Sequence, residues 1–200
     1  MNNINSQLQK LMDREHGKPD THSVLLSVQS GDKRLDFQGA AGEADPESPY
    51  FIASITKIFT ATVVMQLVDE GKLDLEDPIA KYLSHLPLDG IHIYKGVDYS
   101  KQLKVGQLLH QTSGLADYFN GGLVEDFKKN QDRAYSVEDV LALARKAKPF
   151  AAPDSGKSHY SDTNFQLLGA LIETITGQTL AAAFKTRIFG PLAMADTYLF

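Results

Sequence analysis

Two serines in the sequence are followed three residues later by a lysine, at Ser30–Lys33 and at Ser54–Lys57. The first pair falls in a turn between two short apolar segments, where the spacing has no evident use. The second pair opens a long apolar segment that ends at Gly71, a pattern that predicts a helix over 54–70. Residues three apart share a helix face, so the Lys57 amine can reach the Ser54 hydroxyl. A serine beside a basic group can attack a carbonyl carbon as a nucleophile.

The expected place of Ser54, at the start of a helix, adds electrostatic help. The N–H groups of a first turn have no partner inside the helix, so the N–H of Ser54 can hold an oxyanion, and the helix dipole favours the negative charge. Burial in an apolar helix would lower the pKa of the Lys57 amine and make it a base near neutrality. The alternative is that Lys57 extends into solvent from the first turn.

Other chemistries find no support in the sequence. The chain has no cysteine, which excludes thiolate nucleophiles, disulfides and cysteine-based zinc sites. Its six histidines form no metal-ligand pair of the H-E-x-x-H type, and no glycine-rich phosphate loop occurs. We therefore expect neither a metal nor an organic cofactor. With a net charge of −5 and no basic stripe, binding to nucleic acid is not expected.

The spacing of apolar residues predicts the elements that must position this chemistry. A helix is predicted over 3–16, then a strand over 23–29 and a returning strand that carries Leu35 and Phe37, with a loop over 39–49. The helix at 54–70 is apolar on nearly all sides, so we expect it to be buried. Short helices follow near 78–83, 105–110 and 137–147, and a capping box at Ser136–Asp139 opens the last of these. Then come a helix that carries Phe165 to Ile175 and ends at Gly177, and one capped by Thr179 that runs to about Phe189.

Length and composition bound the class of protein. The chain has 200 residues, of which 42% are hydrophobic and 22% are charged, as is typical of a soluble globular domain. No window reaches the run of about 18 apolar residues that a membrane span needs. The residues from Met1 to Leu8 lack the charged and apolar regions of a secretory signal, so we expect a cytoplasmic protein without a membrane span. A chain whose signal had been trimmed would look the same.

Five segments resemble, in order, motifs of the serine β-lactamase and penicillin-binding-protein superfamily. They are 51–61, 73–83, 108–115, 160–169 and 188–197, and the resemblance runs from about Ser23 to Phe200. The most similar branch holds class C β-lactamases, D-Ala-D-Ala carboxypeptidases and related esterases. The resemblance implies an α/β (α+β) fold of the β-lactamase/transpeptidase type, with an antiparallel sheet flanked by helices and a mostly helical subdomain. It implies one catalytic domain over 1–200, with parts 1–58, 59–160 and 161–200.

The resemblance also implies roles for single residues. Ser54 matches the nucleophile that becomes acylated, Lys57 the partner lysine, and Tyr160 the tyrosine that carries the proton to the leaving group. Taken alone, Tyr160 would be interpreted as a core or rim tyrosine. A literal Tyr-x-Asn triplet occurs at Tyr118–Asn120, but it lies too close to Gly114 for this role and is predicted to be a loop.

The segment His-Gln-Thr-Ser-Gly at 110–114 resembles the family's His-Thr-Ser-Gly segment. We predict a structural role for it near the site. Gly114 would permit a backbone turn, and His110 would be a buried hydrogen-bonding residue rather than a base. Gln111 stands where the family more often has a small residue or a histidine.

Asp162 departs from the family, which commonly has asparagine at this position of the second motif. We assign Asp162 and Asn164 a substrate-binding or supporting role. An ionised carboxylate cannot donate a hydrogen bond to a substrate carbonyl, and near Lys57 it would raise the pKa of the lysine. We therefore predict that the role of base shifts toward Tyr160, while Lys57 stays charged and stabilises the phenolate.

The family's third motif, Lys-Thr-Gly or His-x-Gly on a strand, has no match after Asn164. Lys185-Thr-Arg187 does not fit, because arginine follows and the segment is predicted to be helical. The family's C-terminal strands are also absent from the sequence. We expect a missing C-terminal segment to be supplied by the same polypeptide or by another chain, unless the protein is not a competent enzyme alone.

The resulting prediction is a serine hydrolase that forms an acyl-enzyme on a small-molecule or short-peptide substrate. An esterase or a D-amino-acid peptidase of the carboxypeptidase kind is favoured over a dedicated β-lactamase, although binding of β-lactams fits the same site. The alternatives are a non-catalytic module that binds peptidoglycan-like ligands or serves assembly, and an N-terminal fragment without activity of its own.

Overall fold

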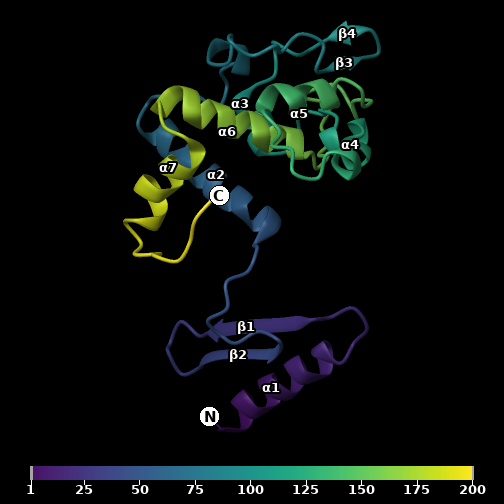
Figure 1. The fold of residues 1–200 in the computed structure, drawn as a ribbon. Helices are drawn as coiled ribbons and strands as arrows, with labels where there is room; N and C mark the ends of the chain where they lie inside the picture. Colours follow the sequence, from purple (N-terminus) through teal and green to yellow (C-terminus); the bar gives the residue numbers. More distant parts are fainter. Residues whose placement is uncertain (1, 200) are drawn as a thin grey trace. The chain divides into compact units, whose positions relative to one another are not determined.

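The computed structural model of the protein describes residues 2–199, so Met1 and Phe200, the ends of the expected domain, lie outside it. The chain divides into two compact units, Met1–Phe51 and Ile52–Phe200 (Figure 1). Each unit is described by itself. The organisation as one domain over 1–200 stays a prediction.

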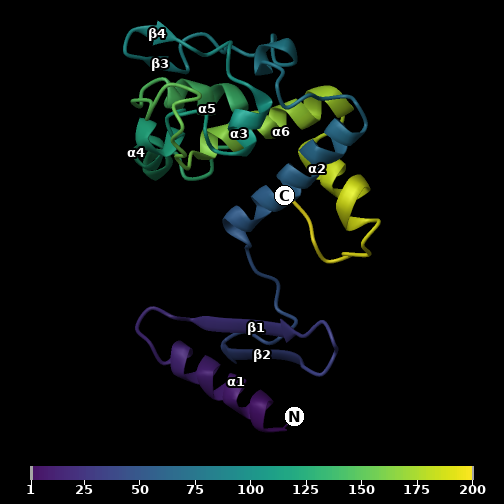
Figure 2. The same cartoon turned by 180° about the vertical axis from the view of Figure 1, so that it is seen from behind.

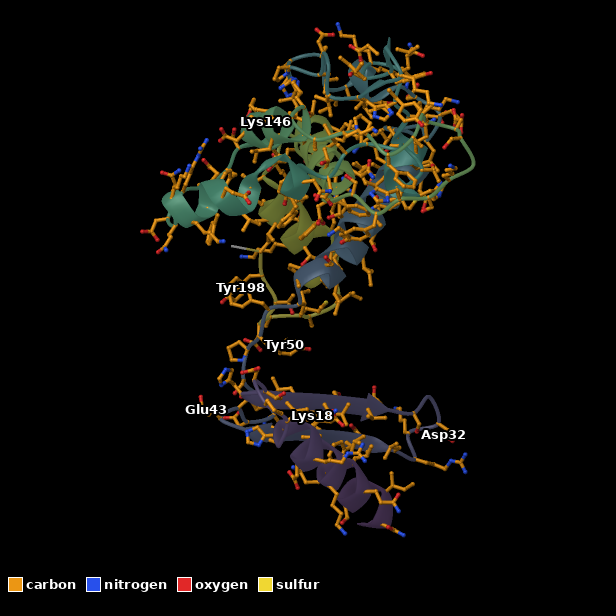
Figure 3. The ribbon with its side chains drawn as sticks, turned by 90° about the vertical axis from the view of Figure 1, so that its right-hand side faces the viewer. Lys18, Asp32, Glu43, Tyr50, Lys146 and Tyr198 are labelled. Carbon is orange, nitrogen blue, oxygen red and sulfur yellow. The ribbon has the colours of Figure 1, made fainter. Side chains whose placement is uncertain are left out.

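The first unit is a helix packed on an antiparallel hairpin. Helix α1 (Asn2–His16) precedes strands β1 (Ser23–Gln29) and β2 (Asp36–Gly42), which pair from Ser23 with Gly42 to Gln29 with Asp36. Met12 of α1 is buried, as is Phe37 of β2. Figure 3 shows Asp32 at the turn that joins the two strands. The helix and both strands were predicted from the spacing of their apolar residues.

The prediction of a loop over 39–49 is wrong for residues 39–42, because β2 continues to Gly42. These residues are glycine and alanine, which have low strand propensity. Pairing with β1 and the close approach of α1 decide their conformation instead: the Gln9 amide donates to the carbonyl of Ala40 at 3.0 Å. A Cβ atom at Gly42 would lie 2.2 Å from the carbonyl oxygen of His22.

The second unit is mostly helical. A 3-10 turn at Ala53–Ile55 leads into α2 (Thr56–Asp69), and α6 (Asp162–Thr176) packs against it and against α3, α5 and α7. Figures 1 and 2 both show α2 and α7 beside α6. The other helices are α3 (Val105–Leu109), α4 (Leu123–Lys129), α5 (Val137–Ala144) and α7 (Leu180–Phe184), the last continued by a π-helical turn at Lys185–Phe189. A short hairpin joins β3 (Ile93–Tyr94) to β4 (Val97–Asp98).

The prediction that α2 is buried on all sides is wrong. Val63, Val64 and Leu67 are fully buried, whereas Ile55 is 56% exposed and Ile58 is 64% exposed. The physical reason is that, within this unit, α6 and α7 contact α2 along one face. The helix also starts later than expected, since Ser54 lies in the 3-10 turn before it.

Local capping signals placed several helices correctly. Ser136 accepts from the N–H of Asp139 in a capping box at the start of α5, and Thr179 accepts from the N–H of Ala182 at the start of α7. Gly177 ends α6 in the left-handed conformation with φ +66°. The helix predicted near 78–83 is a 3-10 turn at Ile79–Lys81, and the segment Tyr118–Gly121, expected to be a loop, is also a 3-10 turn.

Over residues 2–199, no single helix has the length and apolar character to cross a bilayer. Only α6 taken together with 180–189, which meets it at a bend of 77°, satisfies those criteria.

Candidate active site

Ser54, Lys57 and Tyr160 meet in the second unit. The hydroxyl oxygens of Ser54 and Tyr160 lie 2.8 Å apart, and the Lys57 ammonium donates to the Ser54 hydroxyl at 3.1 Å. Ser54 belongs to the 3-10 turn, Lys57 to the first turn of α2, and Tyr160 to the strand-like segment just before α6. The spacing of Ser54 and Lys57 brings them together locally, whereas Tyr160 arrives from 106 residues away.

Asp162 closes these three residues into a ring of polar contacts. Its Oδ1 lies 2.5 Å from the Lys57 Nζ and accepts from the Tyr160 hydroxyl at 3.3 Å. Because Tyr160 donates its proton to Asp162 and Lys57 donates to Ser54, the Ser54 hydroxyl is left as the donor to Tyr160. The Ser54 proton thus points to Tyr160, and the Tyr160 proton points to the Asp162 carboxylate.

The contacts of Lys57 favour the charged ammonium, contrary to the expectation that burial would make the amine a neutral base. Burial does act to lower the pKa of Lys57, but the hydrogen bonds to Asp162 and Tyr160 outweigh it and raise the pKa above that of an ordinary lysine. The cation also lies 5.1 Å from the centre of the Tyr160 ring. This agrees with the alternative prediction, in which Asp162 keeps Lys57 protonated.

The hydroxyl groups of the ring are open and its ion pair is sheltered. Tyr160 is 51% exposed and Ser54 is exposed, while the side chains of Lys57 and Asp162 are 20% and 22% exposed. A pocket between α2 and α6 begins at the ion pair and is lined further by Thr56, Thr60 and Gln166, among others. A substrate can therefore approach Ser54 from solvent while the charges beneath stay fixed.

Ala53 presents Ser54 through an unusual backbone conformation. Its φ of +46° lies in the left-handed region, which L-amino acids with a side chain rarely adopt. The conformation turns the chain sharply just before the helix. Ser54 consequently lies in the 3-10 turn that leads into α2, and the N–H groups at the start of a helix lack partners within it.

The segment 111–118 forms the frame that holds Tyr160 and Asp162. The carbonyl of Ala116 accepts from the hydroxyls of Ser161 and Thr163, at 3.1 and 2.8 Å. The Asp117 carboxylate accepts from the N–H of Asp162 at 3.0 Å. These bonds start α6 at a defined place, and so determine where Asp162 stands relative to Lys57.

A buried polar network lies beneath the second motif. The Gln111 Oε1 accepts from the N–H of Ser161 at 2.9 Å and from the Asn164 amide at 2.5 Å, and Asn164 accepts from the Ser113 hydroxyl at 2.6 Å. Asn164 is fully buried, so its position is that of a supporting residue and not of one that touches substrate. Gln111 and Ser113 were not singled out as site residues, and their only sequence signal was the unusual glutamine in the 110–114 segment.

The other structural residues near the site differ in outcome. Gly114 has φ +72°, and a Cβ atom there would lie 2.2 Å from the carbonyl oxygen of Ala151, so only glycine fits this turn. His110 is exposed at the end of α3, which corrects the expectation that it is buried. The reason is that the neighbouring Gln111 turns inward and takes the buried hydrogen-bonding position. Tyr118 is half-buried, and burial together with the Asp162 carboxylate raises its pKa.

Within the described residues 2–199, no group of three or more His, Asp or Glu side chains is arranged to hold a metal ion. The ring of Ser54, Lys57, Tyr160 and Asp162 supplies what acyl transfer needs from side chains: a hydroxyl nucleophile, a hydroxyl able to pass a proton, and a fixed cation.

Comparison with known proteins gives consistent matches. The family model described as Beta-lactamase matches residues 8–200. Penicillin-binding protein 4 of Amycolatopsis lactamdurans is 30% identical over 157 residues, which are 78% of this chain and 38% of that protein. A putative D-alanyl-D-alanine carboxypeptidase of Escherichia coli O157:H7 is 32% identical over 74% of this chain and 33% of its own length.

Among solved structures, the D-stereospecific amidohydrolase from Streptomyces sp. is similar with a TM-score of 0.79 and 30% identity. The match covers 94% of this chain and 54% of the amidohydrolase. The mixed α/β fold is therefore that of the β-lactamase/transpeptidase class. The chain spans about a third to a half of the length of these relatives.

Proposed function

The chain belongs to the Beta-lactamase family, and on that basis we propose that it is a serine hydrolase that forms an acyl-enzyme on Ser54. The observation that supports this most directly is the position of the Ser54 hydroxyl, 2.8 Å from the Tyr160 hydroxyl and 3.1 Å from the Lys57 ammonium. An exposed nucleophile thus lies within hydrogen-bond reach of both a proton carrier and a cation.

Tyr160 first gives up its hydroxyl proton to solvent. In the first step, Ser54 Oγ then attacks the carbonyl carbon of an ester or amide, and the Tyr160 phenolate accepts the serine proton. Tyr160 then passes this proton to the leaving oxygen or nitrogen as the bond to the carbonyl carbon breaks. In the second step, water attacks the acyl-serine ester and gives its proton to Tyr160. The acid leaves, and the proton returns to Ser54.

Lys57 acts in this scheme as a fixed positive charge. The ion pair with Asp162 keeps it protonated, so it does not take the serine proton. Its ammonium instead stabilises the negative charge on Tyr160, whose ring centre lies 5.1 Å away. The N–H of Ser54 contributes to the oxyanion site.

The substrate class that fits is a small molecule or short peptide with an amide or ester bond next to a D-amino acid. Support comes from the relatives, which are named as a D-stereospecific amidohydrolase and a putative D-alanyl-D-alanine carboxypeptidase. Asp162 supports hydrolysis of amides or esters over efficient turnover of β-lactams. An asparagine amide at this position could donate a hydrogen bond to a carbonyl of the β-lactam substrate, whereas an ionised carboxylate cannot.

Reaction with a fluorophosphonate or a penicillin, followed by intact-mass measurement, tests the proposal. We expect one covalent adduct on the wild-type chain and none on Ser54→Ala. Release of ammonia from a D-amino-acid amide then tests turnover. Folded wild-type protein that forms no adduct would overturn the proposal, and would favour a module that binds such ligands without cleaving them.

A further inference from the structure

We propose that Gln111 is a positioning residue that holds Tyr160 against Ser54 by fixing the chain on both sides of the tyrosine. This inference rests on the serine hydrolase function proposed above. Gln111 makes no contact with Ser54 and acts only through the backbone that carries Tyr160.

Gln111 binds both neighbours of Tyr160. Its backbone carbonyl accepts from the N–H of His159 at 2.9 Å, and its side-chain Oε1 accepts from the N–H of Ser161 at 2.9 Å. The two bonds bracket Tyr160 in the chain. They leave its backbone little freedom to rotate, so the direction in which the phenol leaves the chain is set by Gln111.

The bracket is anchored in the buried part of the unit. The same Oε1 accepts from the Asn164 amide on the first turn of α6, and Asn164 accepts from Ser113. Ser113, Ser161 and Asn164 are fully buried. Water therefore does not compete for these bonds, and a displaced Gln111 side chain would leave Ser161 and Asn164 without their acceptor.

Gln111 holds this position in spite of two unfavourable features. Its backbone has φ +59°, a left-handed conformation that strains a residue with a side chain. Its Nε2 is buried without a hydrogen-bond partner in the described part of the chain. A strained residue with an unsatisfied amide is not what packing alone would favour, and it lies directly beneath the exposed tyrosine of the site.

The contacts also specify which chemistry is needed at position 111. Both side-chain bonds end on Oε1, which accepts, and none that we observe uses the Nε2 donor. An acceptor oxygen is therefore sufficient. Gln111→Glu keeps that oxygen, whereas Gln111→Met has a similar length and no acceptor.

Gln107 provides a matched control on the same segment. It is also a buried glutamine whose Oε1 accepts one backbone N–H, that of Lys104, at 2.9 Å. Gln107→Met therefore removes a comparable buried acceptor and destabilises the fold by the same means. It does not alter the segment that carries Tyr160.

The test is the rate at which a fluorophosphonate phosphonylates Ser54, with loss of fluoride, measured by intact mass with and without Tyr160→Phe. We expect Gln111→Met to slow phosphonylation by about tenfold to a hundredfold and Gln111→Glu to stay within about threefold of wild type. In the Tyr160→Phe background, Gln111→Met should have no further effect. An equal slowing in that background, or by Gln107→Met, would overturn the positioning role.

Hydrogen exchange of the Ser161 amide separates this inference from the proposed function. We expect faster exchange in Gln111→Met than in wild type and Gln107→Met, whether or not Ser54 reacts. If wild-type protein is inert to the probe, the hydrolase proposal fails. The exchange result still tests whether Gln111 fixes the backbone on both sides of Tyr160. Unchanged exchange in Gln111→Met would overturn this inference.

Discussion

The ion pair between Lys57 and Asp162 determines which atoms can move a proton at this site. A lysine three residues after a serine is well placed to be a base, but only when its amine is neutral. Here the Asp162 carboxylate, 2.5 Å from the Lys57 Nζ, favours the ammonium and reverses the effect of burial. In the proposed mechanism the exchange of protons then falls to the hydroxyl of Tyr160, which contacts both Ser54 and Asp162.

Asp162→Asn is predicted to move the alkaline limb of the pH–rate profile to lower pH. Burial lowers the pKa of Lys57, and Asp162 and Tyr160 oppose it; without the carboxylate one of these opposing groups is gone, so the pKa falls relative to wild type and the ammonium that stabilises Tyr160 is lost at a lower pH. The measurement is the rate of Ser54 acylation against pH. Asp77→Asn, which removes the partner of the exposed Lys81, is the control. A profile that Asp162→Asn leaves in place would contradict the assignment.

Ala53 is predicted to tolerate glycine and to reject valine. At φ +46° a β-branched side chain adds strain of about 1–3 kcal/mol, whereas glycine adopts this conformation freely. Urea unfolding of Ala53→Val, with Ala134→Val in an exposed loop as control, measures the difference. Equal stability of the two valine variants would show that Ala53 does not hold this backbone in solution.

At the scale of elements, the 3-10 turn at Tyr118–Gly121 connects the frame of the site to α5. A Cβ atom at Gly121 would lie 2.0 Å from the carbonyl oxygen of Leu143, so the turn and the helix touch through their backbones. The turn follows Asp117 directly, and Asp117 accepts from the N–H of Asp162. The position of α5 therefore affects the position of the first turn of α6.

Gly121→Ala is predicted to destabilise the protein by about 3 kcal/mol, because the turn must move away from α5 to admit the methyl group. It should also slow acylation, since Asp117 and Asp162 move with the turn. Thermal or urea unfolding gives the first effect and the adduct rate gives the second. Gly31→Ala, where a Cβ atom meets nothing within 4 Å, should change neither.

Sequence alone predicted the elements whose signals are local. Ser136, Thr179 and Gly177 marked helix ends through bonds within a few residues, and each stands at the predicted end. Helix α4 and the β3–β4 hairpin were missed. Strands β3 and β4 have two residues each, too few to show a period, and α4 has only Leu123, Val124 and Phe127 as apolar positions.

The contacts of the site were likewise predictable only where they are local in the sequence. Ser54 and Lys57 meet through helix spacing, so their contact follows from the sequence. Tyr160 and Asp162 were found only through the resemblance of their motif. The bonds from Gln111 to Ser161 and Asn164 span 50 and 53 residues, a distance at which no local pattern exists. Long-range hydrogen bonds of this kind become visible only once the chain is folded.

At the scale of the whole molecule, stability depends on a buried histidine outside the site. His92 is fully buried beside Tyr99, and neither ring nitrogen makes a hydrogen bond of ordinary geometry within the described residues. Burial lowers the pKa of His92 to about 4, and it outweighs the opposing effects of the Asp98 carboxylate and the Ala151 backbone. Between about pH 4 and 6.5, His92 is therefore neutral in the folded protein, whereas in the unfolded chain, where its pKa is about 6.5, it binds a proton.

The protein is therefore predicted to lose stability as the pH falls from about 6.5 to 4, by up to about 3 kcal/mol from this group. Above that range both states are neutral at His92 and the effect vanishes. Urea unfolding at a series of pH values measures the slope. His92→Phe should flatten it, whereas His85→Phe, at an exposed position, should not. A slope that persists in His92→Phe would assign the acid sensitivity elsewhere.

The short distance between Lys57 and Ser54 has a consequence for the lifetime of the protein. In the proposed mechanism an acyl group would be bonded to the Ser54 oxygen, which lies 3.1 Å from the lysine nitrogen. A neutral amine there would attack the ester, and the acyl group would migrate from oxygen to nitrogen as a stable amide that water does not readily cleave. An ammonium has no lone pair for this attack. In the proposed acyl-enzyme mechanism, Asp162 would therefore protect the protein against permanent acylation of Lys57 by keeping that lysine protonated.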